Sequence, residues 1–284
     1  MTERLHPDPI AHDLTARFRK QIWSPFLGAL QRYRMIQPGD RIAVCMSGGK
    51  DSLLMAKCLQ TLRKYSKVPF ELVYLSMDPG YSPENGEKFL AAAEILGIKP
   101  DVFHTDIYSI VDNVKESPCH VCAAMRRGYL YKEAQKRGCN KIALGHHRDD
   151  AAETILLSIL YGGQFKAMMP RLRSENYSGM ELIRPLYFVR EKMVSLWLAS
   201  TGITAITCAC RVTKTVDGGK RARVKRLIAG LEAEQANVVD NIIASSSSVS
   251  LSTVLSFIGS GGEQAVSAMD SLPGWQGEKV DKLF

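Results

Sequence analysis

The feature that most constrains the fold is a short glycine-containing sequence, Ser-Gly-Gly-Lys-Asp-Ser at residues 47–52, which directly follows an apolar run. The run at 41–47 has the composition of a buried strand, and apolar residues recur at helical spacing over 53–64. Adjacent glycines permit positive φ angles and close backbone approach, so consecutive N–H groups can surround an anion at the start of a helix. The pattern predicts a strand, a phosphate-binding loop and a helix, which together open an α/β protein.

This loop differs from the Walker A type of phosphate loop. That type requires Gly at position 44 and Ser or Thr at position 51, where the chain has Val44 and Asp51. Lys50 is expected to bring a positive charge to the phosphates, and Ser47 and Ser52 are expected to bring hydroxyl donors. Asp51 is expected either to cap the helix or to hold Mg²⁺ beside the phosphates.

Predicted strands and helices alternate along most of the chain. Strand patterns cover 41–47, 70–78, 101–107 and 141–147, and helical patterns cover 53–64, 86–98, 124–138 and 149–163. The alternation continues with a helix in 181–201 and a late strand in 202–210. This order predicts the α/β class with a doubly wound parallel sheet.

The chain of 284 residues is long enough for one large domain with appendages. An amphipathic helix is predicted over 10–36, so residues 1–36 are assigned to a helical N-terminal segment. Residues 37–235 form the predicted main domain, which carries the phosphate-binding loop. Residues 236–284 are rich in Ser and Gly and are predicted to be a partly disordered C-terminal extension.

A second polar cluster lies where the predicted strand 141–147 meets the next helix. Its members are Gly145, His146, His147, Asp149, Asp150, Glu153 and Thr154. The carboxyl ends of parallel strands meet at one edge of a sheet, so this cluster and the 47–52 loop can face the same ligand. Carboxylates there suit Mg²⁺ or proton transfer, although an ordinary acidic helix start would have the same composition.

Seven cysteines in a chain without a signal-peptide pattern favour metal or sulfur chemistry over disulfides. Cys119 and Cys122 form a C-x-x-C pair, and Cys208 and Cys210 form a second close pair. Thiolates at these spacings can bind zinc or an iron–sulfur cluster. Cys45 and Cys58 are predicted to be core residues, because they lie on an apolar strand and on a helix face.

The loop at 47–52 and the cluster at 145–154 resemble the two signatures of the PP-loop ATP pyrophosphatase family, whose fold is adenine nucleotide alpha-hydrolase-like. With the cysteines, and with the segments 161–172 and 241–255, the chain most resembles the tRNA 2-thiocytidine synthetases of that family. The resemblance covers most of residues 20–255 and implies that ATP adenylates a pyrimidine C2 oxygen, here of cytidine 32 in the anticodon loop. Sulfur then replaces that oxygen, with AMP and pyrophosphate as by-products.

The resemblance also implies site residues and cofactors. ATP and Mg²⁺ would be bound by Ser47, Gly48, Gly49, Lys50, Asp51, Ser52, Met77, Gly145 and His146. Catalytic roles fall on Lys50, Asp51, Asp149, Asp150 and Arg126. Three cysteines of the family hold a 4Fe-4S cluster with one open iron, which assigns Cys119, Cys122 and one of Cys208 or Cys210 as ligands.

Two departures bear on the target base. The related 2-thiouridine synthetases carry additional cysteine pairs at both ends, which this chain lacks, and this favours cytidine. The 207–227 segment also differs from the Pro-Cys-Asn-Leu-Cys motif that is usual in thiocytidine enzymes, so a 2-thiouridine synthetase is a competing hypothesis. A cluster-free ligase of the lysidine-synthetase type and a zinc-stabilised nucleotide-binding sensor are two more hypotheses that the loop motifs allow.

A formal charge of +8 favours a polyanionic partner, here tRNA. Basic residues that could contact it lie in two runs, Lys166, Arg171 and Arg173, and Lys220, Arg221, Arg223, Lys225 and Arg226. No run of 18 apolar residues occurs, so a cytoplasmic protein without membrane contact is expected. The resemblance further implies a homodimer and a sulfur donor, either a cysteine desulfurase or sulfide.

Overall fold

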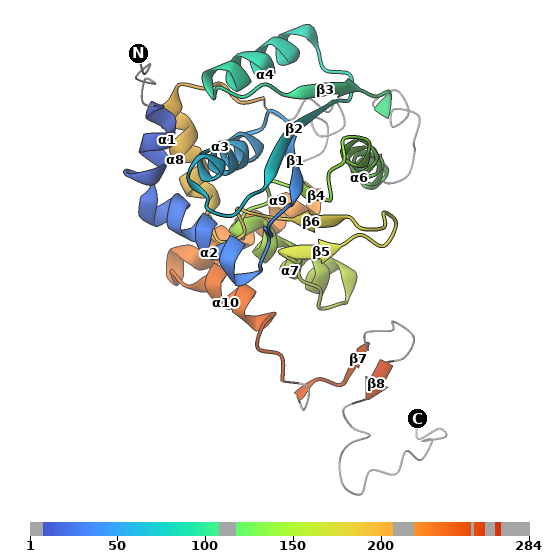
Figure 1. Cartoon of the computed structure of the whole chain (residues 1–284). Helices are drawn as coiled ribbons and strands as arrows, with labels where there is room; N and C mark the ends of the chain where they lie inside the picture. Colours follow the sequence, from blue (N-terminus) through green and yellow to red (C-terminus); the bar gives the residue numbers. More distant parts are fainter. Residues whose placement is uncertain (1–7, 108–117, 207–218, 251–252, 259–264, 268–284) are drawn as a thin grey trace, which may run out of the picture.

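The computed structural model describes residues 8–107, 118–206, 219–250, 253–258 and 265–267, without the side chains of 118–120 and 123. The predicted α/β class with a mainly parallel sheet is confirmed (Figure 1). The sheet has six strands in the order β3 (Asp101–His104), β2 (Glu71–Asp78), β1 (Arg41–Met46), β4 (Lys141–Ala143), β6 (Glu181–Ile183) and β5 (Arg171–Arg173). All neighbouring pairs are parallel except β5 with β6.

Along the chain, helices precede, separate and follow these strands (Figure 1). They are α1 (Pro9–Thr15), the π-helix η1 (Arg19–Trp23), α2 (Ser24–Arg32), α3 (Lys50–Tyr65), α4 (Pro83–Ile95), α6 (Pro118–Lys136), α7 (Arg148–Gly162), α8 (Glu191–Thr201), α9 (Gly219–Glu234) and α10 (Val238–Ser245). Beyond α10, β7 (Ser256–Ile258) and β8 (Ala265–Ser267) form a separate antiparallel pair. No helix in the described ranges is long and apolar enough to cross a bilayer.

The central strand β1 is buried on both faces. Ile42 and Val44 point into the core shared with α3, whereas Ala43 and Cys45 point into the core shared with α6. This alternation follows from the period of two in a strand, and a strand covered on both sides must be apolar throughout. The chain therefore winds around both faces of the sheet, as predicted.

The strand order reverses next to β1, and this positions the candidate site. After β1 the chain proceeds to β2 and β3 on one side, and only then to β4 and β6 on the other. Where the connections from two neighbouring strands run to opposite sides of the sheet, a crevice opens at the carboxyl ends of those strands. Here the two strands are β1 and β4. The 47–52 loop follows β1 and the 144–147 loop follows β4, so both motifs border this crevice.

The single helix predicted over 10–36 is wrong, because the segment is broken into α1, η1 and α2. In η1 the N–H of Trp23 bonds the carbonyl of Phe18, which widens the turn. Pro25 has no N–H with which to continue an α-helical ladder back to Gln21, so a new helix begins around it. The segment is nevertheless integral to the fold, since Ile22 and Phe26 are completely buried.

Three further boundaries differ from the sequence prediction. β4 ends at Ala143 rather than at 147, and α6 begins at Pro118 rather than at 124. Residues 203–206 of the predicted late strand are not in a strand, although the N–H of Ile206 bonds the Gly48 carbonyl at 2.9 Å. Beyond residue 235, α10 packs on α7 and α9 and buries Val239 in the main core.

Candidate active site

The 47–52 loop adopts a compact turn that needs glycine. Gly48 has φ +77°, and a Cβ atom there would lie 2.6 Å from Cδ1 of Ile206. Any other residue at position 48 would therefore meet both backbone strain and a steric clash. Ser52 holds the turn closed, because its Oγ accepts from the Ser47 N–H at 3.1 Å and donates to the Gly49 carbonyl at 2.9 Å.

Gly145 brings the second motif against the first. A Cβ atom at Gly145 would lie 2.9 Å from the carbonyl carbon of Asp51 and 3.0 Å from the nitrogen of Ser52. These neighbours are backbone atoms and cannot rotate away, so only glycine permits this approach. Besides the nucleotide-binding role predicted for it, Gly145 thus has a packing role that juxtaposes the two loops.

The two motifs open onto one cavity of about 790 Å³. The predicted site residues that line it are Ser47, Asp51, Ser52, Met77, Arg126, Gly145, His146 and Asp150. Gly48, Gly49, Lys50 and Asp149, which were also predicted, do not line it. The volume is within the range of small-molecule sites and is large enough for a nucleotide-sized ligand.

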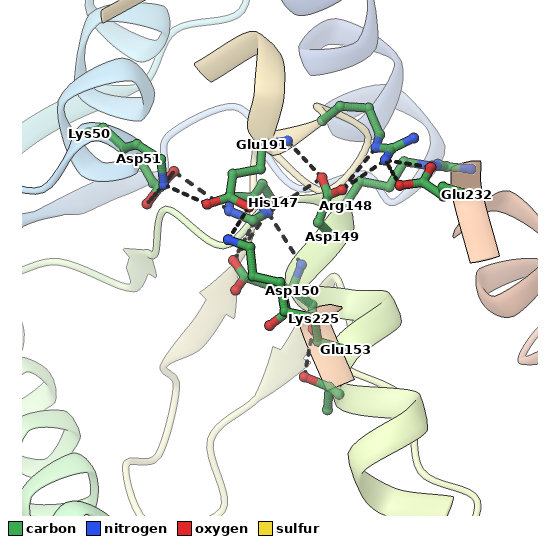
Figure 2. A network of polar contacts seen from close by, with 12 residues as sticks. Lys50, Asp51, His147, Arg148, Asp149, Asp150, Glu153, Glu191, Lys225 and Glu232 are labelled. Carbon is green, nitrogen blue, oxygen red and sulfur yellow. Dashed lines mark hydrogen bonds and ion pairs between the residues drawn. The ribbon is translucent and has the colours of Figure 1, made fainter. Parts of the chain in front are cut away.

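Lys50 lies beside the cavity in a chain of ion pairs (Figure 2). Its Nζ is 3.0 Å from Oδ1 of Asp51 and 3.1 Å from Oε1 of Glu191, and Lys225 contacts the other Glu191 oxygen at 2.5 Å. Burial alone raises the pKa of Glu191, but the hydrogen bond from Lys225 and the charge of Lys50 outweigh it and lower the pKa to about 2. Glu191 therefore stays ionised and holds the loop lysine near the cavity wall.

Replacing Glu191 by Gln is expected to lower the free energy of unfolding by about 1–3 kcal/mol at pH 7, because charged hydrogen bonds are lost. The folded-state pKa is lower than the ordinary value of 4.5, so this stabilisation exists above pH 4.5 and is lost as the pH falls toward 2. The difference between wild type and Glu191→Gln in denaturant unfolding should therefore shrink between pH 6 and pH 3. Glu175→Gln, at an exposed position, is the control, and a difference independent of pH would contradict the argument.

Asp150 has two tasks, one at each carboxylate oxygen. Oδ2 accepts from the His147 N–H at 3.0 Å while His147 Nδ1 accepts from the Asp150 N–H, which forms a capping box at the start of α7. Oδ1 lies 3.1 Å from Nη1 of Arg221, which also contacts Glu153 at 3.0 Å. Burial raises the pKa of Glu153. The capping role and a position facing the site thus coexist in one side chain.

Asp149, by contrast, has its carboxylate engaged in holding α8. Its Oδ2 accepts from the Glu191 N–H at 2.6 Å, and its Oδ1 lies 2.9 Å from the Arg190 guanidinium (Figure 2). Since the N–H groups at a helix start lack partners within the helix, this contact caps α8. The geometry separates the two predicted catalytic aspartates, because Asp150 lines the cavity and Asp149 does not.

His146 lies in the cavity wall in its neutral form. Burial, with the positive charge of Arg184, lowers its pKa to about 4. Its Nδ1 is buried without a hydrogen-bond partner in the described ranges. A neutral imidazole can donate from one nitrogen and accept at the other, so His146 suits a polar group of a bound ligand.

The cysteine pair lies on a helix that leads to the same cavity. Cys119 and Cys122 fall in the first turn of α6, three positions apart, which places both residues on one helix face. Cys122 is half-buried and packs beside Met77 and Ile107, and Arg126, one turn further, lines the cavity. The Cys119 side chain and both Cys208 and Cys210 lie outside the described residues, so the predicted ligand set stays a prediction.

The two cysteines predicted to be core residues are confirmed as such. Cys45 and Cys58 are 7% and 0% exposed, and burial raises the pKa of the Cys45 thiol to about 12. Burial also raises the pKa of Cys58. Thiols with raised pKa values remain protonated near neutral pH and are poor nucleophiles and metal ligands. Among the residues whose side chains are described, no group of three potential metal ligands occurs.

The predicted basic runs divide into inward and outward residues. Arg221 and Lys225 bond the carboxylates of the site, and Arg171 pairs with Glu181 at 2.8 Å. Arg173 is 90% exposed, and Lys220 lies 5.1 Å above the ring of Tyr161. Individual positions in a charge run therefore have different roles, which the sequence pattern could not distinguish.

Glu191, Arg127 and Arg184 belong to the site but were not predicted from the sequence. Arg127 and Arg184 line the cavity, and Glu191 bonds Lys50. A signal was present for Arg184, since it directly follows a strand of the parallel sheet and thus lies at the same edge as the loops. Glu191 opens a helix distant in sequence from the loop, and only the folded chain brings it to Lys50.

Comparison with known proteins agrees with this geometry. The family model of the PP-loop domain matches residues 20–209. The tRNA-cytidine(32) 2-sulfurtransferase of Shewanella pealeana is 35% identical over 248 residues, covering 85% of this chain and 77% of that protein. The enzyme of the same name from Geobacter sulfurreducens is 37% identical over 218 residues, covering 76% and 84%.

Among solved structures, the U34-tRNA thiolase NcsA from Methanococcus maripaludis with its 4Fe-4S cluster has a TM-score of 0.63 to this chain. The two chains are 20% identical, and the match covers 78% of this chain and 76% of NcsA. At this identity the likeness concerns the fold, which both chains share.

Proposed function

The chain belongs to the PP-loop family together with its tRNA-cytidine(32) 2-sulfurtransferase relatives, and from this membership we propose that it is an ATP-dependent tRNA sulfurtransferase acting on cytidine 32. The observation that carries the proposal is the cavity between β1 and β4. The phosphate loop, Asp150, Met77 and the cysteine-bearing helix α6 all border it. A cluster-free ligase or a nucleotide sensor would not require a cysteine-bearing helix beside its nucleotide site.

The phosphate loop would bind ATP. Ser47 presents its hydroxyl, Ser52 keeps the turn closed, and the free N–H groups at the start of α3 attract anions. Lys50 would exchange its contact with Glu191 for a phosphate oxygen. Met77, at the end of β2, would contact the adenine through its backbone. Asp51 and Asp150 supply carboxylate oxygens on the same cavity, and this donor set suits Mg²⁺.

The reaction requires activation of a poor electrophile. The C2 oxygen of cytidine would attack the α-phosphorus of ATP, pyrophosphate would leave, and the adenylated oxygen would become a leaving group. Sulfide would then add at C2 and AMP would depart. Asp150 would assist through the metal or by taking a proton, and Arg126 would stabilise the negative charge that develops.

We assign the sulfur-carrying group to the cysteine-bearing end of α6. Cys119 and Cys122 on one helix face, with one of Cys208 or Cys210, would hold a 4Fe-4S cluster, and the cluster would supply sulfur for the activated base. Cys122 beside Met77 brings this face to the cavity wall, and Arg126 stands one turn deeper along α6. The sulfur donor, either a cysteine desulfurase or sulfide, and a homodimer complete the proposal.

Anaerobically purified protein should convert an unmodified tRNA transcript with C32 to a 2-thiocytidine product when ATP, Mg²⁺ and sulfide are supplied. Mass spectrometry of the digested tRNA would identify the product, and omission of ATP is the control. A transcript with U32 tests whether uridine is the target, and thiolation of that transcript alone would reassign the substrate. A colourless, zinc-loaded protein without product would contradict the proposal.

A further inference from the structure

The cavity contains arginines that differ in their electrostatic state. Arg221 is neutralised, because Asp150 and Glu153 both contact its guanidinium. Arg126, Arg127 and Arg184 also line the cavity, and none of them has a carboxylate partner within the described ranges. Part of the Arg184 guanidinium is buried, and a cation out of bulk water is stabilised by an anion. With two further arginines on the same wall, the cavity therefore favours an anionic ligand.

Arg184 is the most confined of the three. Its Nη1 donates to the Met169 carbonyl, and its Nε is buried without a hydrogen-bond partner in the described part of the chain. Burial, with the charge of Arg127 adding to it, lowers the pKa of Arg184 to about 10. A buried charged donor without a partner is unfavourable, so an acceptor delivered by a ligand would relieve it.

Arg184 lies away from the phosphate loop. It follows β6, which is separated from β1 by β4, so the two strand ends are about 10 Å apart at normal strand spacing. Met77 is the penultimate residue of β2, which lies on the opposite side of β1. A nucleotide that runs from Met77 to the loop would therefore lie over β2 and β1, and leave the space over β4 and β6 for another ligand.

We propose that Arg184 and Arg127 form a second anion site that binds a phosphodiester of the RNA substrate next to the target nucleotide. This inference rests on the proposed function and names the part of the substrate that the far side of the cavity holds. Guanidinium groups match phosphate in geometry and can bind it through two parallel hydrogen bonds. Arg184 comes from the end of β6 and Arg127 from α6, so the two approach the phosphate from different elements.

The test measures tRNA binding and ATP binding separately. Arg184→Gln and Arg127→Gln are compared with wild type in binding of an unmodified tRNA transcript without ATP, at several salt concentrations. Each variant should bind tRNA about tenfold more weakly and lower the salt slope by about 0.7–0.9, as expected for one lost phosphate contact. ATP affinity without tRNA should stay within about twofold. Arg184→Lys should retain the salt slope, because its charge remains.

Arg19→Gln, at an exposed position on η1, is the matched control and should leave both affinities unchanged. Arg127 is exposed, so its variant decides the question if Arg184→Gln fails to fold. A loss of ATP affinity with unchanged tRNA affinity would assign the arginines to ATP phosphates and overturn the inference. Unchanged tRNA affinity and salt slope in both variants, while wild type binds and thiolates tRNA, would overturn it without affecting the proposed function.

Discussion

Replacing Lys50 by Met is expected to reduce kcat/KM for ATP-dependent adenylation by about 10²–10³-fold, the usual loss when one group that stabilises a developing charge is removed. Lys50 opens α3 beside the free N–H groups of the loop, and its amine is held beside the cavity by Asp51 and Glu191. Burial lowers the pKa of Lys50, but the two carboxylates raise it by more, so the net pKa is above the ordinary value. The amine is therefore charged at any pH at which RNA is stable. Methionine keeps an unbranched side chain, one atom shorter than that of lysine, and removes the charge.

The measurement is pyrophosphate release that depends on both ATP and tRNA, with the protein shown to be folded by its unfolding transition. Lys64→Met is the matched control, because Lys64 lies on the same helix with 53% of its side chain exposed and with Asp8 at 3.7 Å as its ion-pair partner among the described residues. This control should retain wild-type rates. A Lys50→Met variant with an unchanged rate would show that the loop lysine does not contact the reacting phosphate.

The fold was largely accessible from the sequence because it depends on local patterns. An apolar run in β1, a glycine turn and a helical pattern after it are each read from neighbouring residues. The π-helix η1 was not predictable in this way. It arises where Pro25 interrupts the backbone ladder while Ile22 and Phe26 must still reach the core, and the packing partners of these residues are distant in sequence.

The candidate site was accessible only in part. Motifs predicted which loops meet, since strand ends of a parallel sheet share an edge, but they could not separate the roles of two adjacent aspartates. Asp149 caps α8 and Asp150 lines the cavity, and this difference depends on where α8 begins. Arg184 and Glu191 were missed because their significance lies in their neighbours, an unpaired guanidinium in one case and a loop lysine in the other.

Replacing Cys122 by Ala is expected to abolish sulfur transfer, at least a hundredfold below wild type, while ATP binding persists. Cys122 packs beside Met77 on the first turn of α6, outside the phosphate loop. Because Met77 would contact the adenine through its backbone, loss of a neighbouring thiol side chain should leave ATP binding in place. Removing one thiolate from a three-cysteine set leaves too few ligands to hold an iron–sulfur cluster. This variant should therefore bind ATP but fail to transfer sulfur.

Iron and acid-labile sulfide analysis after anaerobic purification, together with mass spectrometry of the tRNA product, measures the loss. ATP affinity, measured without tRNA, should match wild type. Cys58→Ala is the control, because Cys58 is a completely buried thiol on α3 that does not line the cavity, and its raised pKa disfavours metal binding. It should keep the iron and the activity. If Cys122→Ala retained both iron and thiolation, Cys122 would not be a cluster ligand, and sulfur would reach the activated base without it.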